Sequence, residues 1–91
     1  MAWFLVETRY VPEKYQDVRP RHRDWLQRLA ADGTVAVAGP LADDSGAVIL
    51  MQAEDADALE KILDSDPYHL EGALAERNAR EYRPLLGAWV R

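Results

Sequence analysis

The sequence contains no cysteine, which excludes a disulfide scaffold, a zinc site with thiolate ligands and a cysteine nucleophile. Its five glycines are isolated from one another, so no glycine-rich phosphate-binding loop is predicted. Long apolar runs are missing too, and the N-terminus reaches Glu7 after a short apolar stretch without a basic segment. We therefore expect no signal peptide, no membrane association and a cytoplasmic location.

Basic residues are outnumbered, with 11 Lys and Arg against 16 Asp and Glu, which gives a net charge of −5. That balance argues against nucleic acid or an anionic membrane surface as the main partner. The 91 residues, 48% of them hydrophobic, predict one domain spanning 1–91.

The N-terminal half predicts a strand, a helix and a hairpin. Residues 2–11 are rich in aromatic and β-branched residues and are followed by Pro12, which is typical of a strand that ends there. Residues 17–33 predict a helix with Pro20 in its first turn and Gly33 just past its end. Residues 34–41 and 47–52 predict two strands joined by the polar turn 43–46.

The C-terminal half predicts two helices and a last strand. Asp55 caps one helix, and the pair Asp66-Pro67 is a start signal for a second, short one. Residues 74–83 have helical propensity, but Gly72 and Pro84 bracket them, and a strand here completes a four-stranded sheet. The order β-α-β-β-α-β predicts an α+β, ferredoxin-like fold, an antiparallel sheet with its helices on one face.

Apolar residues occur on both faces of the first and third predicted strands, with Trp3 and Leu5 on the face away from the helices. Because an apolar sheet face is costly to leave in water, we expect a second copy of the chain to cover it. The sequence therefore predicts a homodimer.

His22 is the most informative single residue. It interrupts an apolar helical stripe that includes Val18, Trp25 and Leu29, so its imidazole lies in or beside the core. Histidine is the side chain whose ordinary pKa lets it exchange protons near neutrality. The ordinary interpretation is a core histidine with satisfied nitrogens; the functional one is a general acid or base.

Three further residues converge with His22 if the fold holds. Asp66 follows the second helix, and a carboxylate is a common partner that fixes one imidazole tautomer. Gly39 and Pro40 end the second strand, where backbone can approach a ligand. Each has a structural alternative, since Asp66 suits a helix cap and Gly39 suits close packing.

Other constellations give weaker signals. Two histidines in different elements and scattered carboxylates predict no metal site, and His69 is expected to face solvent. Asp43 and Asp44 are interpreted as a solvated hairpin tip rather than a cation site. A run of arginines on the first helix is favoured as a solvated outer face over a surface that steers an anionic substrate; its members are Arg19, Arg21, Arg23 and Arg28.

An ordered set of segments resembles the YCII-related (YciI-like) domain family. The set runs through residues 19–26, Gly33, 38–41, 44–46, 65–68, Gly72 and 83–84. The resemblance implies a dimeric α+β barrel with a His–Asp pair, which corresponds here to His22 and Asp66. Its remaining segments contribute Ser45 and Tyr68, which join Gly39 and Pro40 as candidate substrate-binding residues. The last strand and the extension 85–91 depart from the family pattern.

Two function hypotheses follow. The first is a cofactor-independent enzyme in which His22 and Asp66 perform acid–base chemistry of the isomerase, elimination or lyase type. The resemblance implies a small hydroxylated aromatic or lactone substrate, with dehydrochlorination as one possibility. The second is a non-catalytic dimeric module that binds a small metabolite. The two differ in whether an imidazole nitrogen opens onto a cavity.

Overall fold

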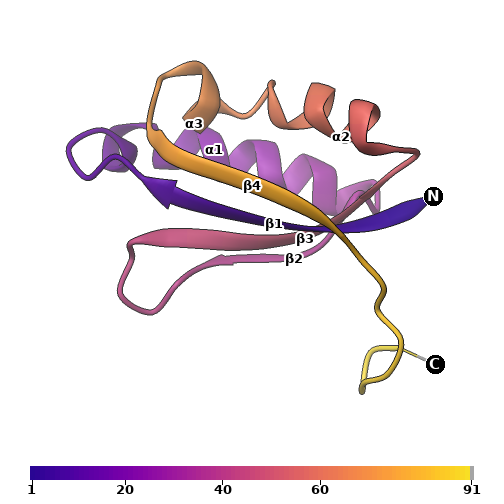
Figure 1. Cartoon of the computed structure of the whole chain (residues 1–91). Coiled ribbons are helices and arrows are strands. Elements are labelled where there is room, and N and C mark those ends of the chain that lie inside the picture. The colour runs from indigo at the N-terminus through magenta and orange to yellow at the C-terminus, as the bar shows by residue number, and fades with distance from the viewer. Residues whose placement is uncertain (91) are drawn as a thin grey trace.

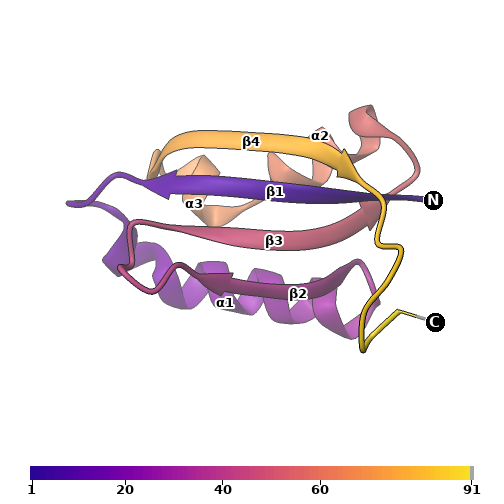
Figure 2. The same ribbon diagram turned by 60° about the horizontal axis from the view of Figure 1, so that its bottom comes forward.

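A computed structural model describes residues 1–90 as a four-stranded antiparallel sheet with three helices (Figure 1). The elements, in chain order, are β1 (Ala2–Tyr10), α1 (Tyr15–Ala31), β2 (Val35–Pro40), β3 (Gly46–Ala53), α2 (Ala56–Leu63), α3 (Pro67–Leu70) and β4 (Leu74–Tyr82). The strand order across the sheet is β2-β3-β1-β4, as Figure 2 shows. This confirms the predicted ferredoxin-like α+β fold.

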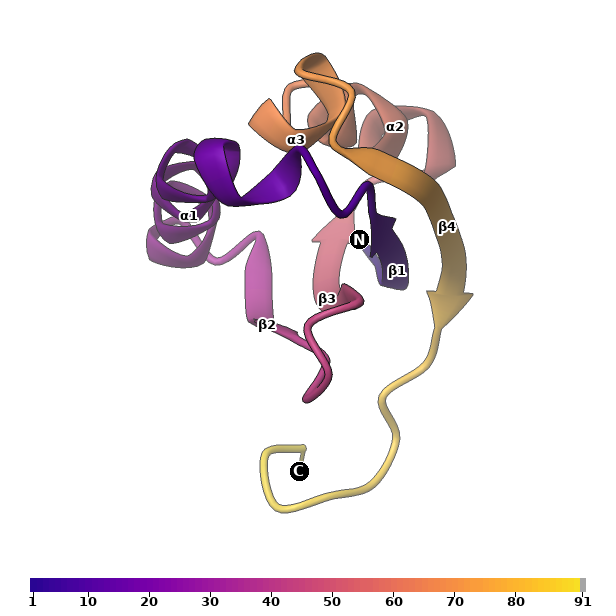
Figure 3. The same ribbon diagram turned by 90° about the vertical axis from the view of Figure 1, so that its left-hand side faces the viewer.

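All three helices lie on one side of the sheet, as the view along the strands shows (Figure 3). Alternation along the strands sends every second side chain to that side: Phe4, Val6 and Tyr10 of β1 are buried there. In β3 the buried set is Ala47, Ile49, Met51 and Ala53. Leu59 and Leu63 of α2 and Trp25 of α1 complete the core from the helix side. No helix among residues 1–90 is long and apolar enough to cross a membrane.

Helix α1 begins two residues before the predicted start. Tyr15, its first residue, stacks on Tyr10 with ring centroids 4.5 Å apart and donates a 2.9 Å hydrogen bond to Asp44. Those contacts hold an extra half-turn of helix in place, so Pro20 lies in the second turn rather than the first. The end is as predicted: Gly33 follows the C-cap with φ +87°, a conformation that glycine adopts without strain.

Residues Leu74–Tyr82 form a strand, as predicted against their helical propensity. The pairing with β1 runs from Trp3↔Tyr82 to Tyr10↔Leu74, and supplies hydrogen bonds that a lone helix could not add to the sheet. Arg77 occupies a helix-side position in this strand and ion-pairs with Glu60 and Asp64. Arg77 thus ties β4 to α2.

The sheet face away from the helices is uncovered. Leu5, Val37, Val48, Leu50 and Tyr82 line a shallow groove of about 440 Å³ on it. Beyond β4 the chain leaves the sheet and extends away from it on this open side (Figures 1 and 3). This segment carries the exposed side chains of Leu85, Leu86 and Trp89.

Candidate active site

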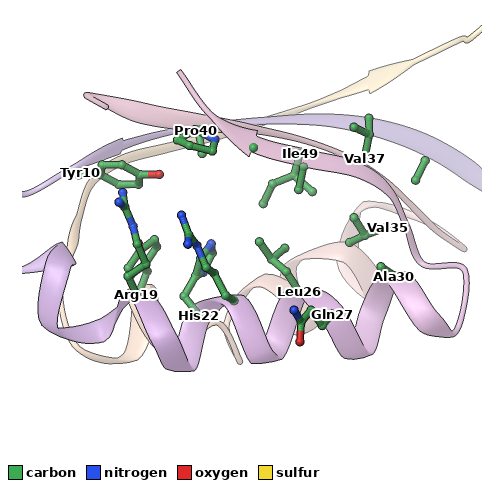
Figure 4. Close-up of a pocket in the computed structure, with 16 residues that line it drawn as sticks. Tyr10, Arg19, His22, Leu26, Gln27, Ala30, Val35, Val37, Pro40 and Ile49 are labelled. Carbon is green, nitrogen blue, oxygen red and sulfur yellow. The ribbon is translucent and has the colours of Figure 1, made fainter. Parts of the chain in front are cut away.

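A cavity of about 390 Å³ lies between α1 and the strands β2 and β3. The side chain of Leu26 points from α1 into the cavity, while Val35 and Ile49 line it from the sheet (Figure 4). These apolar side chains occupy one end; Arg19 and His22 of α1 lie toward the other, near Tyr10 and Pro40. The cavity is therefore polarised, with an apolar end and a cationic end.

The predicted contact between His22 and Asp66 is present. His22 Nδ1 lies 2.7 Å from Asp66 Oδ1, and both residues are buried, at 6% and 3% exposure. The same oxygen accepts a 2.9 Å hydrogen bond from the backbone N–H of Tyr68, because Asp66 caps α3. A carboxylate oxygen can only accept hydrogen bonds, so we infer that Nδ1 is the donor in this contact and carries a proton.

With Nδ1 protonated, Nε2 of the neutral ring carries the free lone pair. Within residues 1–90 Nε2 makes no hydrogen bond, yet it is not among the side-chain atoms buried without a partner. His22 lines the cavity (Figure 4), and we infer that Nε2 is its accessible nitrogen. An imidazole arranged in this way can remove a proton from a molecule in the cavity and return it.

Aromatic side chains hold the imidazole in position. The Tyr68 ring stacks on His22 with centroids 3.9 Å apart and planes 14° from parallel. Trp25 packs against the imidazole at 5.8 Å, and its indole N–H donates to Ser65 Oγ at 2.9 Å. The ring of His22 thus has its hydrogen bond supplied by Asp66 at the cap of α3, and its packing supplied by Tyr68 of α3 and Trp25 of α1.

Arg19 departs from the interpretation of the arginine run as a solvated outer face, whereas Arg21, Arg23 and Arg28 are exposed as expected. Its guanidinium donates to Asp44 Oδ1 at 2.8 Å and to the Tyr68 hydroxyl at 3.3 Å, and it lies over the Tyr15 ring at 4.9 Å. Only 23% of its side chain is exposed. Arg19 precedes His22 by three positions, so the two side chains lie on the same side of α1, the side that faces the sheet.

The hairpin tip is solvated as expected at Asp43, whereas Asp44 beside it is only partly exposed and bonds to α1. The hydrogen bonds of Asp44 to Arg19, and then to Tyr15, hold the pKa of its carboxyl below the ordinary value. The same bond raises the pKa of Arg19. Burial raises the pKa of the nearby Tyr10 hydroxyl, which therefore stays protonated at neutral pH.

The other candidate residues divide. Gly39, Pro40 and Tyr68 line the cavity. A Cβ placed at Gly39 would meet no atom within 4 Å, so packing within the chain does not require a glycine at this position. Ser45 is not brought to the cavity: its hydroxyl and its backbone N–H both bond to Asp43, which closes the β2–β3 turn.

Sequence reasoning did not assign Tyr10, Arg19 and Arg23 to the site, although all three line the cavity. A signal was present, because Arg19, His22 and Arg23 are spaced i, i+3 and i+4 and so share one side of a helix. Within the part of the chain that the structure describes, no three His, Cys, Asp or Glu side chains converge to hold a metal ion. His69 is exposed, as expected.

Comparison with known proteins agrees with this geometry. The family model described as the YCII-related domain matches residues 2–83. The chain belongs to the YCII-related domain family. A search of curated protein sequences finds no match.

Among solved structures, the chain is similar to the 5-chloro-2-hydroxyhydroquinone dehydrochlorinase of Burkholderia phenoliruptrix AC1100, in complex with 2,5-dihydroxybenzoquinone. The TM-score is 0.77 at 25% sequence identity, covering 89% of this chain and 93% of that one. This YCII-related domain therefore shares its fold with an enzyme.

Proposed function

We propose that this YCII-related protein is an acid–base enzyme in which His22 transfers a proton and Asp66 orients and charge-stabilises it. One observation carries the proposal: His22 lines a cavity of about 390 Å³ while its Nδ1 is held by a buried carboxylate, which leaves Nε2 as the nitrogen available to a ligand. A histidine kept only for packing has no need of that arrangement. Proton transfer of this kind requires no cofactor.

The proposed reaction is removal of HCl from a small hydroxylated aromatic ring. A hydroxyl proton is first transferred to the chlorine-bearing carbon, which gives the keto tautomer with that carbon tetrahedral. Nε2 of His22 then removes a second hydroxyl proton, and chloride departs with the electron pair of its bond to carbon, which leaves a hydroxyquinone. Support comes from the similar solved enzyme, which is a dehydrochlorinase of a hydroxyhydroquinone. The cavity adds to it, since 390 Å³ accommodates a single substituted ring.

The test is chloride release from 5-chloro-2-hydroxyhydroquinone, with the quinone product followed by absorbance. We expect turnover by the native chain and a loss on the order of 10²–10⁴-fold in kcat for His22→Ala. His69→Ala is the matched control, because the only other histidine lies outside the cavity. Equal activity of the two variants would refute the role of His22.

The alternative is a non-catalytic module that binds a small metabolite in the same cavity. It predicts ligand binding without turnover of either the chlorinated ring or an unsaturated lactone. It also predicts that His22→Ala lowers stability, by about 1–3 kcal/mol for the partner left unpaired. An available Nε2 favours the enzyme, because proton transfer requires a free imidazole nitrogen at the cavity. A module that only binds a ligand would work equally well with both nitrogens hydrogen-bonded inside the protein.

We further propose that the protein is a homodimer formed through the open sheet face. The apolar groove of Leu5, Val37, Val48, Leu50 and Tyr82 supports this, because a surface of that composition is stabilised by burial. Light scattering at micromolar concentration should give twice the chain mass, and Leu50→Glu should give a monomer. A native monomer at that concentration would remove the dimer.

A further inference from the structure

The cavity wall carries a charge opposite in sign to that of the protein. The chain has a net charge of −5, yet no Asp or Glu is among the residues that line the cavity. The ionic groups there are Arg19 and Arg23, beside the titratable His22. A wall of this kind in an acidic protein favours a negatively charged ligand.

The two arginines are not equivalent. The charge of Arg19 is matched by Asp44 at 2.8 Å, and its Nε donates to Tyr68. No carboxylate among residues 1–90 forms an ion pair with Arg23. The guanidinium of Arg23 therefore has its charge and its N–H donors available to bind a ligand in the cavity.

The position of Arg23 in α1 relates it to the reacting nitrogen. It follows His22 directly and lies one helical turn after Arg19. Its charge is felt at Asp44, whose pKa is lowered first by Arg19 and Tyr15 and to a lesser degree by Arg23. The unmatched charge thus belongs to the cationic end, which holds His22, while the apolar end beside Leu26 and Val35 is uncharged (Figure 4).

We propose that Arg23 binds an oxyanion of the ligand and so makes this cavity selective for compact aromatic or quinonoid anions. A guanidinium pairs with such a group through two parallel N–H bonds, which fixes orientation as well as position. The ring of the ligand then extends toward the apolar end and presents its edge to Nε2 of His22. This inference rests on the proposed function only in placing the ligand beside His22.

Two sources of the oxyanion are compatible with this chemistry: an acidic ring hydroxyl and a carboxylate attached to the ring. 2,5-Dihydroxybenzoquinone represents the first, since its hydroxyls are vinylogous acids that ionise at neutral pH, and 2,5-dihydroxybenzoate represents the second. 2,5-Dimethoxybenzoquinone is the uncharged reference with the same ring. Isothermal titration at one ionic strength measures all three with the native chain and with Arg23→Gln.

We expect Arg23→Gln to weaken binding of at least one anion about tenfold and to change binding of the uncharged quinone less than about twofold. The anion that loses affinity identifies the source. Arg28→Gln is the matched control, because it removes the same charge from an exposed position of α1 outside the cavity, and it should alter each affinity less than about twofold. Arg23→Lys, which keeps the charge but cannot form the two parallel N–H bonds, should bind the anion with an affinity between those of the native chain and Arg23→Gln.

Anion affinity that is unchanged in Arg23→Gln would overturn the inference, as would equal weakening by Arg28→Gln or equal loss of the uncharged quinone. The result is separable from the proposed function. Binding through Arg23 without turnover of any substrate removes only the enzyme, whereas turnover that depends on His22 with unaltered binding in Arg23→Gln removes only the role of Arg23.

Discussion

Replacing Asp66 by Asn separates the charge of this side chain from its hydrogen bonds. Asp66 Oδ1 accepts from both His22 Nδ1 and the Tyr68 backbone N–H. An asparagine oxygen in the same place accepts both bonds and caps a helix about as well as aspartate does. We therefore expect the free energy of unfolding to fall by less than about 1 kcal/mol, a change of a few degrees in Tm.

Activity should respond differently, because a working His22 becomes an imidazolium during the reaction. A hydrogen bond to a charged partner is worth about 1.5–3 kcal/mol, against about 0.5–1.5 kcal/mol for a neutral one. At 2.7 Å and 3% exposure the His22–Asp66 pair belongs to the stronger class. Loss of the carboxylate charge should lower kcat by about tenfold to about a hundredfold, since each tenfold corresponds to about 1.36 kcal/mol.

The matched control is Asp55→Asn, the same substitution at the cap of α2. Asp55 accepts from the Ala58 backbone N–H at 2.8 Å and has no histidine partner. Both variants should melt within a few degrees of the native protein, and only Asp66→Asn should lose chloride release. A large loss of Tm in Asp66→Asn, with unchanged activity per folded molecule, would show that the pair is structural and refute the acid–base reasoning.

Three further outcomes follow from the same structure. The hydrogen bond from Arg19 lowers the pKa of Asp44 below its ordinary value of about 3.9. The ionised carboxylate therefore stabilises the fold above that pH, and this stabilisation is lost as the pH falls through the lowered pKa. Thermal melts should show a smaller acid-induced loss of Tm in Asp44→Asn than in the native chain. Gly46→Ala should lower Tm strongly or prevent folding, because its Cβ would lie 1.9 Å from a backbone oxygen of β1, whereas Gly39→Ala, with no atom within 4 Å, should leave Tm nearly unchanged. Arg77→Ala should lower the free energy of unfolding by about 1–2 kcal/mol in denaturant titrations, since it leaves two carboxylates of the α2 segment without their shared cation; a loss below about 0.3 kcal/mol would show that the bridge is only a surface pair.

The element order could be read from the sequence because each signal acts locally. The Asp-Pro start of α3, the Asp55 cap and Gly33 after α1 depend on backbone groups a few residues away, and all three are found as predicted. The strand β4 was harder, since its residues favour a helix and only the need for a fourth strand indicated otherwise. The start of α1 was misplaced because Tyr15 is held by Tyr10 and Asp44, which are distant in sequence or in another element.

The sequence by itself determined the fold class, the burial of His22 on a helical stripe and the pairing of His22 with Asp66 as candidates. It could not determine which arginine is matched. Arg19 and Arg23 lie on one side of α1 and have identical side chains, but the β2–β3 turn carries Asp44 to Arg19, and no carboxylate among residues 1–90 forms an ion pair with Arg23. Nor could the sequence show that His22 lines a cavity, because that depends on how far α1 lies from the sheet. Charge pairing and cavity shape arise from contacts between segments separated by tens of residues, and only the tertiary structure decides those.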